Sequence, residues 1–285
     1  MTTTAQTSGT FTLGGDLNIY RMGFGAMRIT GKGAFGPPAD HQKALQVLRE
    51  VLQLGINFID TADSYGPHHS EQLIAEALRP YPKDLVIATK GGFERPSASE
   101  WTMNGDPTYL ENALKGSLQR LGQERIDLYQ LHRIDPKVPA EETLGKLKDL
   151  QQAGLIRHIG LSEVSVEQLE MASKIIDVVA VQNRYSLTNR KWEGVLRWCE
   201  QNDAAFIPWY PLDAGALENP TLQQLALKYD LTVYQLALAW LLAHSPNMLP
   251  IPGTSSVAHL RENVAAAAVA LSPVDKEALD NIAAS

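Results

Sequence analysis

From about residue 21 to residue 271 the chain alternates short apolar runs with longer amphipathic segments, and no linker-like stretch interrupts this alternation. Short apolar runs are typical of buried parallel strands, and apolar residues three or four apart are typical of helices that cover them. We expect strands at residues 22–25, 57–60, 85–90, 126–131, 156–161, 178–182, 205–208 and 248–251. Eight such units close a (β/α)8 barrel, and 285 residues suit that fold. The sequence therefore predicts a single barrel domain spanning residues 1–285.

The ends of the expected helices carry capping residues. Glycine follows two leucine-patterned segments, residues 44–54 and 144–150, at Gly55 and Gly154, where a left-handed helix end suits it. Helix starts are expected at four capping side chains: Asp106, Asn219 and Ser272, each before a proline, and Ser165, paired with Gln168 in a capping box. Residues 11–20 alternate around two glycines, which predicts a β-hairpin closing the bottom of the barrel, and the helix from Ser272 is expected to be an accessory C-terminal helix.

An open doubly wound sheet is the competing architecture. That fold usually carries a Gly-x-Gly-x-x-Gly turn after its first strand. Residues 23–28 read Gly-Phe-Gly-Ala-Met-Arg, so the third glycine of that turn is missing. The barrel is therefore the favoured interpretation.

Composition excludes several classes of protein. The net charge is −7 and the basic residues are not clustered, which argues against a nucleic-acid partner. Cys199 is the only cysteine and lies in a helical pattern, so it is expected to pack in the core, and no disulfide forms within the chain. No apolar run reaches the roughly 18 residues of a membrane span, and the first ten residues lack the features of a secretion signal. We expect a cytoplasmic monomer with no membrane partner.

Four polar residues come at or just after the ends of three consecutive expected strands. Asp60 ends the second strand, Tyr65 follows on its loop, Lys90 ends the third, and His132 comes directly after the fourth. Active sites of (β/α)8 barrels lie at the carboxyl ends of the strands, and neighbouring strands are about 4.8 Å apart. Each residue alone has an ordinary structural explanation, but their joint appearance predicts one converging site.

Such a cluster suits proton transfer to a developing alkoxide. A tyrosine with a pKa of about 10 is a poor acid at neutral pH. We expect the Lys90 ammonium to lower the pKa of Tyr65, and Asp60 to keep that ammonium charged. His132 is expected to hydrogen-bond a substrate carbonyl oxygen. The alternative is a lyase or aldolase in which Lys90 forms a Schiff base.

Five further histidines show no spacing typical of metal ligands, so no metal is expected. We interpret them as surface or structural residues: His41, His68, His69, His158 and His244.

Four local sequences carry a resemblance to a known family. They are Gly-Ile-Asn-Phe-Ile-Asp-Thr-Ala-Asp-Ser-Tyr-Gly at residues 55–66 followed by Glu71, Ile-Asp-Leu-Tyr-Gln-Leu-His at 126–132, Ile-Arg-His-Ile-Gly-Leu-Ser at 156–162, and Ile-Pro-Gly-Thr-Ser at 251–255 with Glu262 and Asn263. Together they resemble the aldo-keto reductase superfamily. Two variants, Gly-Leu-Ser-Glu at residues 160–163 and Ile-Pro-Gly-Thr-Ser-Ser at 251–256, are similar to a bacterial branch that includes pyridoxal reductases. The resemblance implies reduction of an aldehyde or ketone with NADPH, with Asp60, Tyr65, Lys90 and His132 as catalytic tetrad.

The resemblance also implies a set of cofactor contacts. The nicotinamide carboxamide is expected at Ser162, Glu163 and Gln182, where glutamate replaces the family's asparagine. Trp209 is expected to stack on the nicotinamide, and Leu212 with residues 213–217 to cover the pyrophosphate. The remaining expected cofactor residues are Ala26, Met27, Gly253, Thr254, Ser255, His259, Glu262 and Asn263.

At the adenosine 2′-phosphate the sequence departs from the family, because Gly253 and His259 stand where lysine and arginine are frequent. Arg261 is a candidate to compensate. Arg28 is expected to contact either an anionic substituent of the substrate or a surface carboxylate. Substrate loops are expected near Met27, Arg28, Tyr65, Phe93, Trp101 and Trp209. A further alternative is a nucleotide-sensing or scaffold protein that keeps this fold as a binding module.

Overall fold

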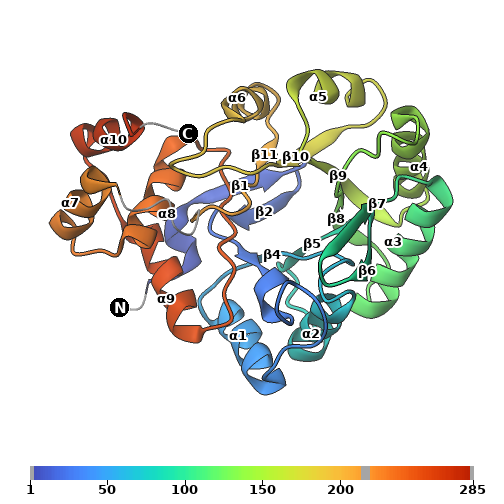
Figure 1. The fold of residues 1–285 in the computed structure, drawn as a ribbon, viewed down its shortest axis with the longest axis horizontal. Helices are drawn as coiled ribbons and strands as arrows, with labels where there is room; N and C mark the ends of the chain where they lie inside the picture. The colour runs from blue at the N-terminus through green and yellow to red at the C-terminus, as the bar shows by residue number, and fades with distance from the viewer. Residues whose placement is uncertain (1–2, 213–218, 283–285) are drawn as a thin grey trace.

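The computed structural model describes residues 3–212 and 219–282. Seven parallel strands curl around a common axis and helices surround them (Figure 1). The strands are hydrogen-bonded in sequence order: β3 (Phe24–Gly25), β4 (Phe58–Asp60), β5 (Val86–Gly91), β8 (Ile126–Leu131), β9 (Ile156–Ser162), β10 (Val178–Gln182) and β11 (Ala205–Phe206). Their parallel order excludes the doubly wound sheet, in which the strand order reverses.

Residues 247–251 close the barrel between β11 and β3. Phe206 N–H donates to Asn247 O at 2.8 Å, and Leu249 N–H donates to Phe206 O at 2.8 Å. On the opposite side, Gly23 N–H donates to Pro250 O at 3.0 Å. The eighth strand expected at residues 248–251 is reduced to a single bridge, Phe206 to Met248, because proline cannot donate to a strand ladder. The (β/α)8 fold is confirmed.

The helices begin and end largely where their caps predict. Their bounds are α1 (His41–Gln53), α2 (His69–Leu78), α3 (Pro107–Leu121), α4 (Ala140–Gln152), α5 (Val166–Ala172), α6 (Glu193–Gln201), α7 (Pro220–Lys228), α8 (Val233–His244), α9 (Val257–Ala265) and α10 (Pro273–Asp280). Short 3-10 turns cover Ala5–Ser8, Ala26–Ile29 and Ala266–Ala268. The side chains of Asp106, Asn219 and Ser272 cap α3, α7 and α10. The capping box at the start of α5 and the positive φ of Gly55 and Gly154 are also as expected.

The predicted hairpin closes the amino end of the barrel. It consists of β1 (Thr10–Leu13) and β2 (Leu17–Tyr20) paired antiparallel. Leu13 and Ile19 are fully buried in the same apolar cluster as residues of the barrel interior, including Phe58 and Leu128. Asp16, in the turn, accepts a 2.6 Å hydrogen bond from His158, which confirms a structural role for that histidine.

A second hairpin, which the sequence pattern did not reveal, follows β5. Its strands are β6 (Phe93–Ser97) and β7 (Glu100–Met103), and they lie beside the carboxyl ends of β5 and β8 (Figure 1). Its burial does not alternate cleanly, because most of its residues are exposed or half-buried. Phe93 on β6 and Trp101 on β7 line a cavity at the carboxyl ends of the barrel strands.

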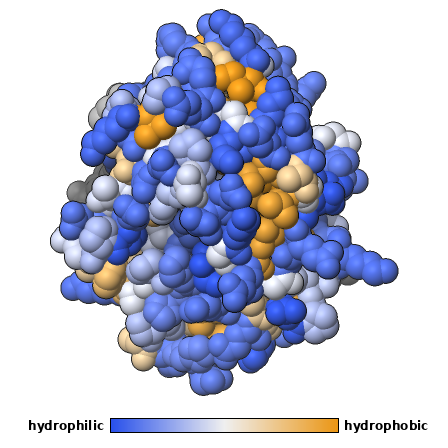
Figure 2. All heavy atoms as spheres, turned by 90° about the vertical axis from the view of Figure 1, so that its right-hand side faces the viewer, coloured by the Kyte–Doolittle hydropathy of each residue, from blue (hydrophilic) through white to orange (hydrophobic). Residues whose placement is uncertain are grey.

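One face of the molecule is largely polar. The face that includes α3 and α4 is mostly hydrophilic, with hydrophobic patches separated from one another (Figure 2). Cys199, on α6, is fully buried, as expected for a packing residue. Within the residues that the structure describes, no helix is long and apolar enough to cross a membrane.

Candidate active site

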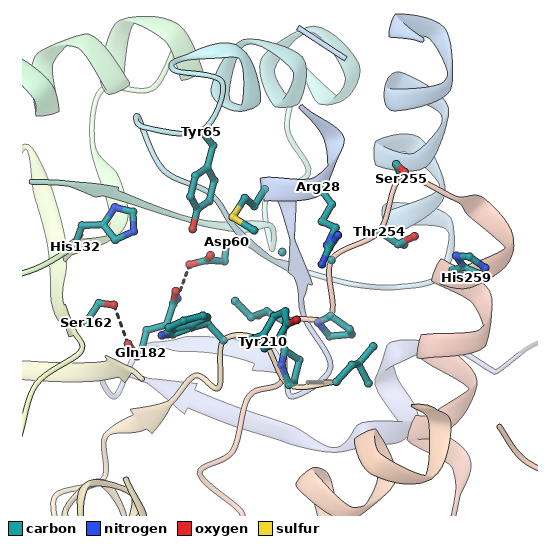
Figure 3. A pocket seen from close by; sticks show the side chains of 18 of the residues that line it. Arg28, Asp60, Tyr65, His132, Ser162, Gln182, Tyr210, Thr254, Ser255 and His259 are labelled. Atoms are coloured by element: carbon teal, nitrogen blue, oxygen red, sulfur yellow. Dashed lines mark hydrogen bonds between the residues drawn. The ribbon is translucent and has the colours of Figure 1, made fainter. Parts of the chain in front are cut away.

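A cavity of about 600 Å³ opens at the carboxyl ends of the barrel strands. Tyr65 and His132 point into one end of it, next to Asp60 and Gln182, and Thr254, Ser255 and His259 lie at the other end (Figure 3). Side chains from the strand ends therefore border the same space as the segment before α9. This elongated arrangement offers one place for a reacting group and a second place for a remote part of a ligand.

Lys90 is at the centre of the buried cluster. Its ammonium donates to Asp60 Oδ2 at 2.7 Å, to Thr61 O at 2.8 Å and to the Tyr65 hydroxyl at 3.2 Å. Lys90 is completely buried, and Asp60 and Tyr65 are nearly so. Neighbouring strands β4 and β5 bring Asp60 and Lys90 together, as the sequence predicts. The cluster is arranged so that one fixed cation contacts both a carboxylate and a phenol.

Two glutamines hold the second carboxylate oxygen. Gln130 Nε2 donates to Asp60 Oδ1 at 2.9 Å, and Gln182 Nε2 donates to the same atom at 2.8 Å. Gln130 is fully buried on β8 and was not predicted as a site residue. Its signal in the sequence is a polar side chain near the end of a largely apolar strand, two residues before His132, because a buried amide needs polar partners. The side-chain amides of Gln130 and Gln182 therefore fix the orientation of the Asp60 carboxylate.

The pKa values of Lys90 and Tyr65 differ in part from the sequence expectation. Burial lowers the pKa of Lys90, but its charge and hydrogen-bond interactions with Asp60 and Tyr65 together more than offset this, so the pKa is raised and the ammonium persists. Burial raises the pKa of Tyr65, and the Lys90 ammonium offsets only part of that increase. The prediction that Tyr65 becomes a stronger acid than an ordinary phenol is therefore wrong. The phenol instead keeps its proton throughout the neutral range.

His132 is a neutral imidazole among aromatic rings. Burial, followed by the nearby charges of Lys90 and Arg133, lowers the pKa of His132 well below its ordinary value. The ring lies edge-on to Tyr65, with centroids 6.0 Å apart, and contacts Phe93 at 4.7 Å. His132 therefore acts as a hydrogen-bonding group rather than a cation in this position.

The structure places most, but not all, of the expected cofactor residues on the cavity wall. Those that line it are Met27, Ser162, Gln182, Trp209, Leu212, Gly253, Thr254, Ser255 and His259. Four others lie away from the wall: Ala26, Glu163, Glu262 and Asn263. Ala26 and Asn263 are buried against the barrel, so their side chains are not presented to the cavity. The expected cover formed by residues 213–217 lies outside the described residues.

Glu163 does not line the cavity, but it contacts Trp209, which does. Its backbone has a left-handed φ of 55°, which turns its side chain toward β10 and the segment after β11. Glu163 Oε1 accepts hydrogen bonds from Trp209 Nε1 at 2.7 Å and from Arg184 N–H at 2.5 Å. The carboxylate that the sequence assigns to the nicotinamide carboxamide is thus engaged in holding Trp209.

The basic residues near the remote end also differ from expectation. Arg261 Nε donates to Glu50 Oε1 at 2.7 Å and does not line the cavity, so it does not replace a cation there. Arg28 does line the cavity, and its side chain extends into it on the side where Thr254 lies (Figure 3). Among the described residues Arg28 makes no ion pair, which is contrary to the expected surface carboxylate. Its guanidinium is available to an anionic group in the cavity.

The groups on the wall suit a nicotinamide dinucleotide. Near Tyr65, Gln182 Oε1 has no hydrogen-bond donor among the described residues, which leaves an acceptor for a carboxamide. The indole of Trp209 offers an aromatic face. At the remote end, two hydroxyl side chains at the start of α9 and the guanidinium of Arg28 suit phosphate groups. The donor and acceptor types therefore match the cofactor that the sequence resemblance implies.

Other wall residues were not predicted from the sequence. Those with a cationic or aromatic side chain are Arg133, Tyr210 and Tyr234. Arg133 Nη1 donates to Ser162 Oγ at 2.9 Å, and Ser162 Oγ donates to Gln182 O at 2.8 Å. Arg133 directly follows His132 at a strand end, which was a usable signal, whereas Tyr234 lies on a helix with no such mark. In residues 3–212 and 219–282 no group of three or more metal-ligating side chains is arranged to bind a metal ion.

Comparison with known proteins places this geometry in a family. The sequence model of the aldo/keto reductase family matches residues 21–284. An uncharacterised oxidoreductase of Schizosaccharomyces pombe is 52% identical over 90% of this chain and 85% of its own length. Pyridoxine 4-dehydrogenase of Escherichia coli is 44% identical over 96% of this chain and 98% of its own. A crystal structure of an aldo-keto reductase from Klebsiella pneumoniae in complex with NADPH superimposes with a TM-score of 0.81, at 26% identity, covering 99% of this chain and 95% of that one.

Proposed function

Because the chain belongs to the aldo/keto reductase family and is an oxidoreductase, we propose that it reduces an aldehyde or ketone to an alcohol with NADPH, and that Tyr65 donates the proton. The observation that carries this proposal is the contact of one buried ammonium, that of Lys90, with both Asp60 and the Tyr65 hydroxyl. That arrangement serves a reaction in which negative charge develops on an oxygen beside the phenol.

The four candidate catalytic side chains have different roles in this reaction. The substrate carbonyl oxygen lies within reach of the Tyr65 hydroxyl and of His132, whose neutral ring orients it. As charge develops on that oxygen, Tyr65 transfers its proton, because an alkoxide is a much stronger base than a phenolate. The Lys90 ammonium stabilises the phenolate that remains, and Asp60 keeps Lys90 charged and in place. The raised pKa of Tyr65 keeps the proton available until the alkoxide forms.

NADPH, when bound, supplies the hydride to the carbonyl carbon. Trp209 would stack on its nicotinamide, Ser162 and Gln182 would hold its carboxamide, and Thr254, Ser255 and Arg28 would hold its phosphate groups. The Klebsiella pneumoniae relative, whose structure contains NADPH, supports this assignment. Depth in the barrel keeps water away from the reacting atoms, since Lys90 and Asp60 are almost inaccessible to solvent.

The substrate is proposed to carry an aromatic or heteroaromatic ring. The relative named pyridoxine 4-dehydrogenase acts, by its name, on a pyridine derivative. Around the candidate proton donor the wall is formed by rings, namely Phe93, Trp101 and His132. A planar apolar group attached to the carbonyl would suit such a wall.

The two alternative functions are less well supported. A Schiff-base mechanism requires a neutral amine on Lys90, whereas here Lys90 is an ammonium that pairs with Asp60 and also donates to Thr61 O and the Tyr65 hydroxyl. A binding module without turnover would not need a buried cation beside a protonated phenol, and this cluster is intact. Both observations favour the reductase.

The proposal is tested by Tyr65→Phe. This substitution removes the transferable proton and leaves the aromatic ring in place, so we expect NADPH to bind within about twofold of its normal affinity while turnover falls by about 10²- to 10⁴-fold. Turnover is measured as NADPH consumption with a panel of aldehydes and ketones, with NADH assayed in parallel. Near-normal turnover in Tyr65→Phe, or no NADPH consumption by the unaltered protein with any carbonyl compound, would contradict the proposal.

A further inference from the structure

Arg95 connects three separate parts of the chain. This arginine lies on β6 and is 7% exposed. Within its own hairpin it donates to Ala98 O at 3.1 Å and to Glu100 O at 3.1 Å. It also donates to Gly33 O at 3.2 Å and Ala34 O at 3.2 Å. A buried guanidinium that satisfies several carbonyls at once fixes the segments that carry them, because any movement would leave polar groups unpaired.

The third part is the loop that carries the candidate proton donor. Arg95 Nη1 also donates to Ser64 O at 3.4 Å, and Ser64 directly precedes Tyr65. The Ser64 hydroxyl in turn lies 3.4 Å from His132 Nδ1. Arg95 is therefore tied to the backbone of Ser64, beside one candidate catalytic residue, and the side chain of Ser64 contacts another.

The guanidinium of Arg95 also supports a wall of the cavity. Its Cζ lies 3.5 Å from the centroid of the Trp101 ring, the shortest cation-to-ring distance among the described residues. Trp101 is 38% exposed and lines the cavity. It packs edge-on against Phe93, with centroids 5.5 Å apart, and against His132 at 6.2 Å. Arg95 thus covers one side of the Trp101 indole, and the indole is still exposed to the cavity.

Several exposed apolar side chains gather around the cavity that this wall borders. Of the large hydrophobic side chains that are exposed in the described part of the chain, Met27, Trp101 and Tyr234 all line the same cavity. An exposed indole is unfavourable in water, and a guanidinium packed on it restricts it to one position before any ligand arrives. A wall fixed in advance binds a flat ring at a lower entropic cost than a mobile one.

We infer that the β6–β7 hairpin determines substrate specificity, that Trp101 and Phe93 bind the planar ring of an aromatic or conjugated carbonyl compound, and that Arg95 is the positioning residue that aligns this wall with Tyr65. This inference rests on the proposed reductase function and names the class of substrate that its site selects. Arg95 does not touch the reacting atoms, and it acts through Trp101 and the Ser64 backbone.

The test compares two aldehydes of nearly equal size, benzaldehyde and cyclohexanecarbaldehyde, with NADPH as reductant. In Trp101→Leu an apolar side chain remains, so both aldehydes lose contact area but only benzaldehyde loses ring-to-ring interactions. We expect KM for benzaldehyde to rise at least about threefold more than KM for cyclohexanecarbaldehyde. Arg95→Met should show the same selective rise, and Arg95→Lys an intermediate one, because an ammonium keeps some hydrogen bonds but cannot stack as a planar fork.

Arg190→Met is the matched control. Arg190 also packs over an indole, that of Trp240 at 4.6 Å, and donates to the carbonyl oxygens of Leu187, Leu279 and Asp280. It does not line the cavity, so Arg190→Met should lower thermal stability without changing the ratio of the two KM values. NADPH affinity, measured by fluorescence titration, should stay within about twofold in every variant. All assays are run below the unfolding temperature of each variant.

Each outcome has a distinct meaning. Equal losses for both aldehydes in Trp101→Leu, or a selective loss in Arg190→Met as well, would overturn the inference while leaving the reductase function intact. If Arg95→Met does not fold, Trp101→Leu still tests the role of Trp101 in specificity, and Arg95→Lys still tests the positioning role of Arg95. Failure of the unaltered protein to reduce either aldehyde or any other carbonyl compound would instead remove the proposed function itself.

Discussion

The indole nitrogen of Trp209 donates a 2.7 Å hydrogen bond to Oε1 of Glu163. Trp209 lines the cavity and Glu163 does not. Glu163, which the sequence assigns to the cofactor, therefore supports the indole ring of Trp209, which is proposed to stack on the nicotinamide. Because Glu163 lies just after β9 and Trp209 just after β11, this contact also ties together two loops at the mouth of the barrel.

The first prediction concerns this contact. Glu163→Leu removes the acceptor for the Trp209 indole and for Arg184 N–H, so we expect the Kd of NADPH to rise about fivefold, which corresponds to roughly 1 kcal/mol. Glu163→Gln keeps an oxygen acceptor and should stay within about twofold of the unaltered protein. Fluorescence titration with NADPH measures both. Unchanged affinity in Glu163→Leu would show that Trp209 does not need this support.

The second prediction is the pH dependence of carbonyl reduction. Reduction requires protonated Tyr65, and its raised pKa means that the proton is lost only above the ordinary phenol value of about 10. The pKa of His132 is well below its ordinary value, so this ring is already neutral and does not change charge near pH 6.5. The rate of reduction at saturating substrate should therefore be flat through neutral pH and fall at strongly alkaline pH. A step near pH 6.5 that disappears in His132→Gln would contradict this assignment.

The third prediction concerns the stability of the buried ion pair. Lys90→Met leaves the Asp60 carboxylate buried without its cation, and such a loss costs about 3–5 kcal/mol of unfolding free energy. Adding Asp60→Asn removes the uncompensated charge, so the double variant should be more stable than Lys90→Met alone by about 1 kcal/mol or more. Urea unfolding followed by circular dichroism measures these differences. A double variant less stable than both single variants would argue against direct coupling.

The fourth prediction concerns Arg28 at the remote end of the cavity. Arg28→Met removes a guanidinium that has no ion-pair partner among the described residues, so we expect the Kd of NADPH to rise about tenfold and its dependence on salt to weaken. Arg49→Met is the matched control, because Arg49 is an exposed arginine on α1 that does not line the cavity. Identical NADPH affinities in the two variants would exclude Arg28 as a phosphate ligand.

Local features of the sequence determined the repeating units and most element boundaries. Apolar spacing, a glycine such as Gly55 at a left-handed helix end, and capping side chains such as Asp106 act within one or two turns of chain, so they can be read directly. The convergence of Asp60 and Lys90 also followed from the sequence, because parallel strands in a barrel end at the same face. The sequence did not indicate the β6–β7 hairpin, whose residues lack a regular burial pattern.

Only the tertiary structure decided the contacts that join distant residues. Gln130 and Gln182 both hold Asp60, and the sequence separations are 70 and 122 residues, too far for any local pattern to reveal. The sequence predicted that Lys90 would lower the pKa of Tyr65, but the depth of burial decides the net direction, and burial is a property of the packed fold. A chain encodes its periodicity and its caps residue by residue, whereas solvent exclusion and long-range pairing exist only once the barrel has closed.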